Sequence, residues 1–162
     1  MRPERDGAGH MQMLLKIFIP VALPGIIAAT IGSPAMNFIP CRLEENGSSL
    51  RVRLSDTIAL PVPDSQATRY RPSAGRELIF GLGPEHITEP RRGERDEARS
   101  FNATLDVVEP VGMETRVYFR LDGTEVCGRV DPASAGQSGE TMRLCANTDQ
   151  MHPIDPRTDA VL

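Results

Sequence analysis

Two turn-forming dipeptides, each set between runs of alternating apolar and polar residues, constrain the fold of this chain most strongly. Asn46-Gly47 comes just before residues 49–54, and Asp122-Gly123 comes just before residues 124–130. Such dipeptides favour tight β-hairpin turns because both positions accept a positive φ. Within residues 49–54, leucine and valine alternate with arginine, which predicts a strand with one buried and one solvated face. The sequence therefore predicts a mainly β domain.

Other segments of similar character extend this prediction. Strands are expected at residues 40–45, 49–54, 58–62, 77–81, 101–109, 114–121, 124–130 and 141–146, with a last short strand within 150–156. Pro61 and Pro63 favour a sheet edge for residues 58–62, since proline cannot donate to a strand partner. Residues 64–75 are polar and are expected to form turns. The solvated loop 89–100 is expected to divide the β region into two halves.

Composition narrows the class of protein. The chain has 162 residues, with 14 Gly, 14 Pro, no Trp and only 4% aromatic residues, so its core must be built from Val, Ile, Leu and Met. A net charge of −4 gives no reason to expect nucleic-acid binding, which needs a basic face. The three cysteines form no CxxC pair, and Cys127 and Cys145 fall within expected strands. Buried, reduced thiols are therefore expected, as in a cytosolic protein.

Residues 1–31 differ from the rest of the chain. Residues 14–31 are apolar except for Lys16 and Thr30, but two prolines and a glycine interrupt them. A membrane helix needs about 20 mainly apolar residues, so this partly helical leader is marginal as a span. Three interpretations remain open: a cleaved signal peptide, a peripheral membrane anchor, or a fragment of a membrane protein.

The third interpretation has support from a resemblance. Residues 6–8 (Asp-Gly-Ala), 17–20 (Ile-Phe-Ile-Pro) and 22–26 (Ala-Leu-Pro-Gly-Ile) resemble the cytoplasmic coupling loop of bacterial ABC importer permeases. The Glu-Ala-Ala that opens the family motif is missing. The resemblance implies a short helix that docks on an ATPase subunit, with Asp6 and Gly7 as interface candidates.

A second resemblance covers roughly 130 residues. Residues 32–39 (Gly-Ser-Pro-Ala-Met-Asn-Phe-Ile) are similar to the segment that leaves the nucleotide-binding domain in importer ATPases of the maltose and glycerol-3-phosphate type. Residues 80–86 (Phe-Gly-Leu-Gly-Pro-Glu-His) match a family motif except at one position, where this chain has Gly83 and the family has an arginine. Residues 108–114 (Val-Glu-Pro-Val-Gly-Met-Glu) match a second motif, and a His followed by an Asp-Pro turn ends the family pattern, as at residues 152–156. The resemblance implies that residues 32–162 form an OB-fold-like small barrel, the TOBE regulatory domain.

The polar residues of these motifs are the site candidates: Pro84, Glu85, His86, Glu109, Gly112 and Glu114. Glu85 and His86 are adjacent, which by itself gives neither a cleft nor a partner for acid–base chemistry, so they are expected to cap the turn. Glu109 and Glu114 are expected to orient a loop or face a partner chain; in a bulged hairpin they would share one side. The three histidines are too scattered for a metal site. No catalytic, nucleotide-binding or metal site and no cofactor are predicted.

The sequence contains no Gly-x-x-x-x-Gly-Lys-Ser/Thr phosphate cradle and no Leu-Ser-Gly-Gly-Gln signature, which predicts no ATP hydrolysis. The resemblances together imply a non-catalytic remnant or accessory of an ABC-type carbohydrate importer. In this hypothesis, part of a permease gene and part of an adjacent ATPase gene are fused near residues 28–32. Its expected partners are an importer ATPase subunit and a permease, at the inner face of the bacterial plasma membrane. Two alternatives remain: an exported small β-barrel protein with a cleaved signal peptide, and a stand-alone small-ligand-binding OB-type domain.

Overall fold

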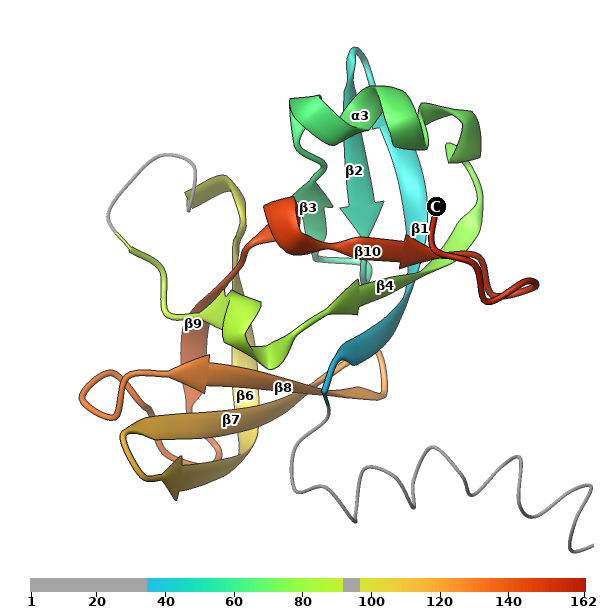
Figure 1. The fold of residues 1–162 in the computed structure, drawn as a ribbon. Helices are drawn as coiled ribbons and strands as arrows, with labels where there is room; N and C mark the ends of the chain where they lie inside the picture. Colours follow the sequence, from blue (N-terminus) through green and yellow to red (C-terminus); the bar gives the residue numbers. More distant parts are fainter. Residues whose placement is uncertain (1–34, 92–96) are drawn as a thin grey trace, which may run out of the picture. The chain divides into compact units, whose positions relative to one another are not determined.

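The computed structural model describes residues 35–91 and 97–162, and residues Ala35–Leu162 form one compact unit. Two five-stranded antiparallel sheets build it (Figure 1). The first sheet has the spatial order β10 (His152–Ile154), β4 (Glu77–Leu82), β1 (Asn37–Asn46), β2 (Ser49–Arg53) and β3 (Ala59–Pro61). The second has the order β5 (Ile87–Thr88), β9 (Thr141–Ala146), β6 (Ser100–Val111), β7 (Glu114–Leu121) and β8 (Thr124–Val130).

Both predicted hairpins are present, but the first turn is shifted by one residue to Gly47-Ser48, because Asn46 pairs with Ser49 at the end of β1. Gly47 has φ 63° in the two-residue turn between β1 and β2, and Asp122 and Gly123 have φ values of 48° and 81° between β7 and β8. A positive φ at both central residues matches the right-handed twist of the flanking strands, which is why Asp-Gly suits this position. β3 lies at a sheet edge, as Pro61 within it and Pro63 just after it predict.

The second sheet curls until its first and last strands meet. A Cβ placed on Gly128 of β8 would lie 2.9 Å from the carbonyl oxygen of Ile87 in β5, so glycine is what permits this close approach. The curl hides most strand edges, as in other small barrels. The predicted fold class, a mainly β, OB-fold-like small barrel, is confirmed.

One core of aliphatic and aromatic side chains runs through both sheets. Leu43 and Phe80 from the first sheet and Val117, Phe119 and Leu144 from the second are at most 1% exposed. Cys41, Cys127 and Cys145 are buried and form no disulfide, which confirms the expectation of buried, reduced thiols.

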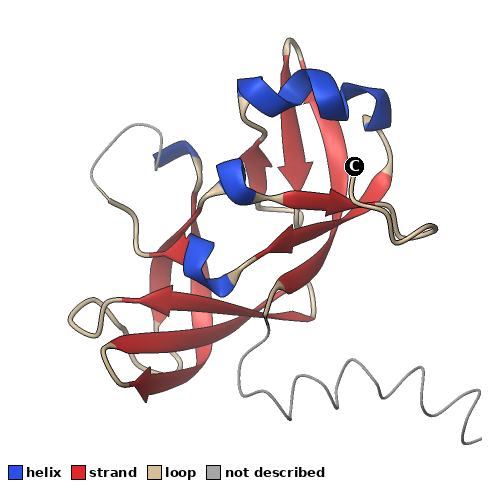
Figure 2. Cartoon of the chain, in the orientation of Figure 1, coloured by secondary structure: helices blue, strands red, loops and turns tan. Residues whose placement is uncertain are grey.

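The segment 64–75 departs from its prediction. It contains a helix, α3 (Asp64–Tyr70), and a 3₁₀ turn, η2 (Arg71–Ser73), drawn in blue in Figure 2. Asp64 stabilises the first turn of α3, while Ala67 and Tyr70, three residues apart, form its buried face. No helix within residues 35–91 and 97–162 is long and apolar enough to cross a lipid bilayer.

Two further 3₁₀ turns connect the sheets: η3 (Pro84–His86) and η4 (Thr148–Gln150). The chain passes from the first sheet to the second through η3 and returns through η4 to β10. The segment 89–99 therefore connects β5 to β6, two strands of the same sheet. The leader, residues 1–31, lies outside the described residues.

Candidate functional site

The motif at residues 83–86 forms the crossing between the sheets. Pro84 is buried at the start of η3, while the side chains of Glu85 and His86 are 50% and 32% exposed. Backbone bonds hold the turn: the N–H of His86 donates to Gly83 O at 3.0 Å, and its carbonyl accepts from the N–H of Asn147 at 2.8 Å. Neither side chain caps the turn, contrary to the sequence-based expectation, because these backbone bonds already fix it.

Gly83 leaves room for a neighbouring carboxylate. A Cβ at this position would lie 2.5 Å from Oε1 of Glu85, so the glutamate side chain folds back over the glycine. His86 Nε2 lies 3.7 Å from the same carboxylate. Glu85 therefore occupies the space that a side chain at position 83 would enter.

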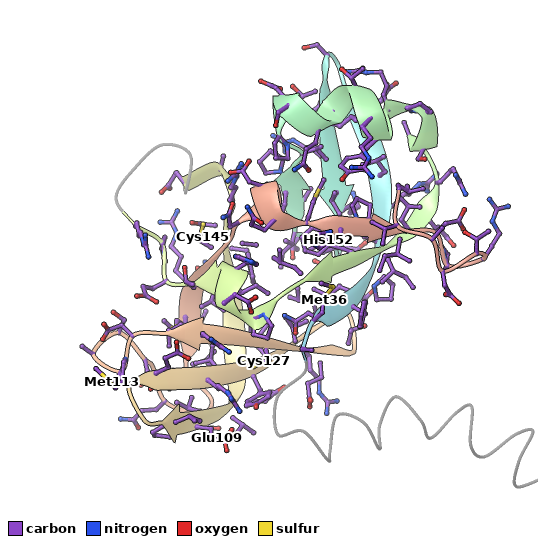
Figure 3. All side chains as sticks on the ribbon, viewed as in Figure 1. Met36, Glu109, Met113, Cys127, Cys145 and His152 are labelled. Carbon is purple, nitrogen blue, oxygen red and sulfur yellow. The ribbon has the colours of Figure 1, made fainter. Side chains whose placement is uncertain are left out.

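The second motif forms the β6–β7 hairpin. Gly112 has φ 64° at the first position of its two-residue turn, and Met113, beside it, is 93% exposed. The register pairs Glu109 with Arg116 and Val111 with Glu114, which places both glutamates on the outer face. Figure 3 shows Glu109 and Met113 on this hairpin.

Both glutamates have polar neighbours on that face. Glu109 Oε2 accepts a hydrogen bond from the hydroxyl of Tyr118 at 3.3 Å, and Glu114 forms an ion pair with Arg129 at 3.3 Å. Burial raises the pKa of Tyr118 above its ordinary value, so its hydroxyl stays a donor at neutral pH. Glu109 is thus held within the β6–β7 hairpin and Glu114 by a side chain of β8, and both remain open to solvent.

Residues of both motifs line one open depression, which has a volume of about 260 Å³. Glu85 from η3 and Glu114 from β7 both line it, with Met113 at its rim. The remaining walls are Thr88, Glu89, Arg91, Arg129, Val130 and Asp131. Carboxylates outnumber guanidinium groups here, so the depression suits a polar protein surface with basic groups better than an anion.

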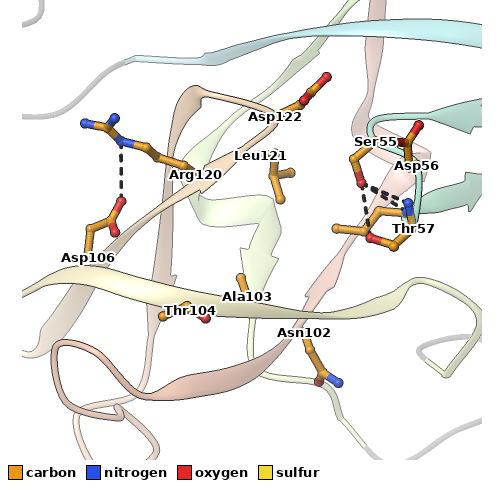
Figure 4. Close-up of a pocket in the computed structure, with 11 residues that line it drawn as sticks. Ser55, Asp56, Thr57, Asn102, Ala103, Thr104, Asp106, Arg120, Leu121 and Asp122 are labelled. Atoms are coloured by element: carbon orange, nitrogen blue, oxygen red, sulfur yellow. Dashed lines mark hydrogen bonds and ion pairs between the residues drawn. The ribbon is translucent and has the colours of Figure 1, made fainter.

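A second depression, of about 430 Å³, has polar walls that sequence reasoning missed (Figure 4). The loop 55–57 forms one side, and Asn102 and Thr104 of β6 form another. Arg120 and Asp106 face each other across 3.6 Å. Within the described residues, no three His, Cys, Asp or Glu side chains are close enough to hold a metal ion.

Two buried polar side chains that sequence reasoning also missed link distant parts of the fold. Asn37, 2% exposed, hydrogen-bonds the backbone of Cys127 and thereby ties β1 to β8. Arg99, 7% exposed, forms a two-pronged ion pair with Asp149 at 2.9 and 3.0 Å, joining the start of β6 to η4. The signal at Asn37 was its place in the inward-facing alternation of β1. Asp6 and Gly7 lie outside the described residues.

Comparison with known proteins agrees with this architecture. Residues 32–87 match the family model of the MalK OB fold domain, and residues 80–154 match that of the TOBE domain. Among solved structures, the fold is similar to that of the cytoplasmic molybdate-binding protein ModG, with a TM-score of 0.52 and 15% identity over 72% of this chain and 94% of that one.

The curated relatives are ATP-binding proteins of importers. The sulfoquinovosyl glycerol transport ATP-binding protein SmoE of Agrobacterium fabrum is 30% identical over 82% of this chain and 35% of its own length. The sn-glycerol-3-phosphate import ATP-binding protein UgpC of Burkholderia pseudomallei is 33% identical over 82% and 35%. The osmoprotective compounds uptake ATP-binding protein GgtA of Synechocystis is 32% identical over 84% and 37%. The chain thus spans about a third of the length of these relatives. Over residues 32–154 it belongs to the MalK OB-fold and TOBE domain families of ABC importer ATP-binding proteins.

Proposed function

We propose that this chain is a non-catalytic accessory of an ABC-type carbohydrate importer. Its role is that of a regulatory domain, which binds an ATP-binding subunit and modulates it without hydrolysing ATP itself. The observation that carries the proposal is the match of residues 32–154 to the MalK OB fold and TOBE models, which are regulatory rather than ATPase domains. The relatives are named for importing hydroxylated solutes such as glycerol 3-phosphate, which favours a similar transport system.

The depression between η3 and the β6–β7 hairpin is the contact surface we propose for this partner. Glu85 and Glu114 come from two separate motifs and face the same depression, and the exposed Met113 adds an apolar contact at its rim. Interfaces of this type combine an apolar anchor with a charged rim that sets specificity. Pro84 and Gly112 fix the two turns that present these side chains, and Glu109 extends the acidic outer face.

The leader adds a second proposed contact. Its resemblance to the permease coupling loop, with Asp6 and Gly7, favours attachment to the importer at the inner face of the plasma membrane. The β domain and the leader would then bind components of one assembly.

Purified components test this proposal. The full chain is mixed with the importer ATP-binding subunit of its host, and complex formation is followed by sedimentation velocity while released phosphate is measured. We expect a complex, and no phosphate release by the chain alone above that of a mock purification. The Glu85→Lys/Glu114→Lys double variant should bind at least tenfold more weakly, whereas Asp56→Lys, an exposed charge reversal in the other depression, should bind normally. Hydrolysis by the chain alone, or no complex, would contradict the proposal.

A further inference from the structure

Two open depressions meet at the ion pair between Asp106 and Arg120. One is the depression of about 430 Å³ beside the loop 55–57, and the other, of about 480 Å³, lies on the outer face of β6, β7 and β8. Asp106 and Arg120 line both depressions, and Val107, Tyr118 and Glu125 complete the second one. We call the two depressions, with the ion pair between them, the Arg120 site.

A β-bulge at Asp106 shapes this site. The pairing of β6 with β7 shifts between Leu105 and Val107, so Asp106 is an extra residue with no opposite residue on β7. Asp106 and Val107 are both exposed although they are neighbours in the chain, which breaks the alternation of the strand. A bulge of this kind turns a side chain out of the regular pattern and is frequent beside functional sites. It thereby presents the Asp106 carboxylate to both depressions.

The ion pair at the centre of the site is not needed to hold the fold. The side chains of Asp106 and Arg120 are 50% and 66% exposed, and their charged atoms are 3.6 Å apart. An ion pair this open to water contributes little to stability. The carboxylate oxygens and the guanidinium N–H groups are therefore able to bond a ligand instead.

The loop 55–57, on the opposite side of the first depression, is fixed by its own hydrogen bonds. The hydroxyl oxygen of Ser55 accepts from the backbone N–H groups of Thr57 and Ile58, at 3.4 and 3.1 Å. A wall that is already ordered loses little conformational freedom when a ligand binds.

The site also has apolar surface. Ile58, Ala103 and Leu121 are buried beneath the first depression, and Figure 4 shows Ala103 and Leu121 in its middle. The second depression is lined by Val107, which is 53% exposed, and by the half-buried ring of Tyr118. Small-molecule sites combine such apolar walls with a few polar groups that fix orientation, and an aromatic ring suits the carbon-bound face of a ligand.

The charges of the site restrict the class of ligand. Its charged lining residues are Asp56, Asp106, Asp122, Glu125 and Arg120. The excess of carboxylates repels an anion, while the guanidinium at the centre opposes a compact cation. Carboxylates only accept hydrogen bonds and a guanidinium only donates them. Adjacent hydroxyl groups on one molecule satisfy both, because each hydroxyl donates and accepts.

We infer that the Arg120 site binds a neutral polyhydroxylated solute, that is, a sugar or a polyol. Asp106 and Glu125 accept hydrogen bonds from its hydroxyl groups, and Arg120 donates to them. Its carbon-bound face packs against Val107 and Tyr118. No residue that lines this site lines the acidic depression proposed for the ATP-binding subunit, so the inference goes beyond the proposed function and stands without it.

A nuclear magnetic resonance titration of the isotope-labelled full chain tests the inference. The probes share a hexose frame and differ in charge: glucose and sorbitol are neutral, glucose 6-phosphate is anionic and glucosamine is cationic at pH 7. The Asp106→Ala/Arg120→Ala variant removes the central ion pair. The Glu97→Ala/Arg143→Ala variant, which removes a different exposed ion pair, is its matched control. Arg120→Gln alone serves if the first variant does not fold.

We expect a neutral probe to cause saturable shifts confined to residues 55–58, 102–107 and 118–125, with the Arg120 side-chain N–H signals among them. The Asp106→Ala/Arg120→Ala variant, or Arg120→Gln in its place, should bind that probe at least tenfold more weakly, and the control variant should bind it normally. The two charged probes should bind more weakly than glucose.

Tighter binding of glucose 6-phosphate or glucosamine than of either neutral probe would overturn the inference, and so would equal losses in the two variants. Shifts that do not saturate, or that spread evenly over the surface, would also overturn it. If they do so in a chain that still forms the complex with its importer ATP-binding subunit, the proposed function remains intact.

Discussion

The side-chain amide of Asn37 pairs with both backbone groups of Cys127, which lies 90 residues further along the chain. Its nitrogen donates to the Cys127 carbonyl at 2.9 Å and to Leu82 O at 3.0 Å, and its oxygen accepts from the Cys127 N–H at 2.8 Å. The amide therefore takes the place of a strand partner between β1 and β8. Because the group is 2% exposed, each of these bonds is sheltered from water.

Asn37→Ala should destabilise the domain by about 2–4 kcal/mol, because it leaves buried backbone groups of Cys127 and Leu82 without partners. Chemical denaturation followed by circular dichroism measures the change. Asn102→Ala, which removes an exposed amide from β6, should change the free energy of unfolding by less than about 0.5 kcal/mol. Equal effects of the two substitutions would mean that the bridge contributes nothing.

Gly128→Ala should cost about 1–3 kcal/mol, because the new methyl group would meet the Ile87 carbonyl at 2.9 Å and its Cγ2 at 3.1 Å. β5 and β8 would have to separate. Gly83→Ala is the matched control, since its methyl group meets only the end of the Glu85 side chain, which can rotate into solvent. Thermal melting compares the two, and a Gly128→Ala variant as stable as Gly83→Ala would show that the sheet is not closed at this point.

The parts of the fold that depend on neighbouring residues could be predicted from the sequence. The turns at Gly47-Ser48 and Asp122-Gly123 are local, and the positive φ values of Gly47, Asp122 and Gly123 fall on residue types that accept them. Helix α3 was missed because only Ala67 and Tyr70 of its seven residues are buried, which is too few to show a helical period.

The arrangement of the site depends on distant contacts and could not be predicted in the same way. Sequence motifs identified Glu85 and Glu114, but their common depression results from the curl of the second sheet, which no local pattern encodes. Likewise, the partner of Asn37 is set by how β1 lies against β8. A lone buried amide in an apolar alternation indicates that a polar partner exists without indicating which one.

Thiol-specific reagents should not react with the cysteines of the folded protein. Cys41, Cys127 and Cys145 are all buried, and burial raises the pKa of the Cys41 thiol to about 12, so the reactive thiolate is scarce at pH 8. A disulfide reagent that releases a coloured thiolate should count three thiols in denaturant. Rapid reaction of a cysteine in the native protein would contradict this burial.

Acid should weaken the C-terminal turn through Asp155. The backbone N–H of Arg157 donates to its carboxylate, and Arg76 lies beside it, so its folded-state pKa is held below the ordinary value of 3.8. A lowered pKa contributes stability that is complete above the ordinary value and is lost as the pH falls through the folded-state value. Asp155→Asn should therefore be less stable than the wild type at pH 7, with a difference that shrinks below about pH 4. A difference that grows in acid would refute this assignment.

Native mass spectrometry of the full chain mixed with its host's importer ATP-binding subunit tests the central claim most directly. The account predicts a complex that contains both chains, which the Glu85→Lys/Glu114→Lys variant forms poorly, and no ATP hydrolysis by the chain alone. Spectra in which the two proteins remain separate at every concentration, although each is folded, would contradict the assignment of this β domain to an importer.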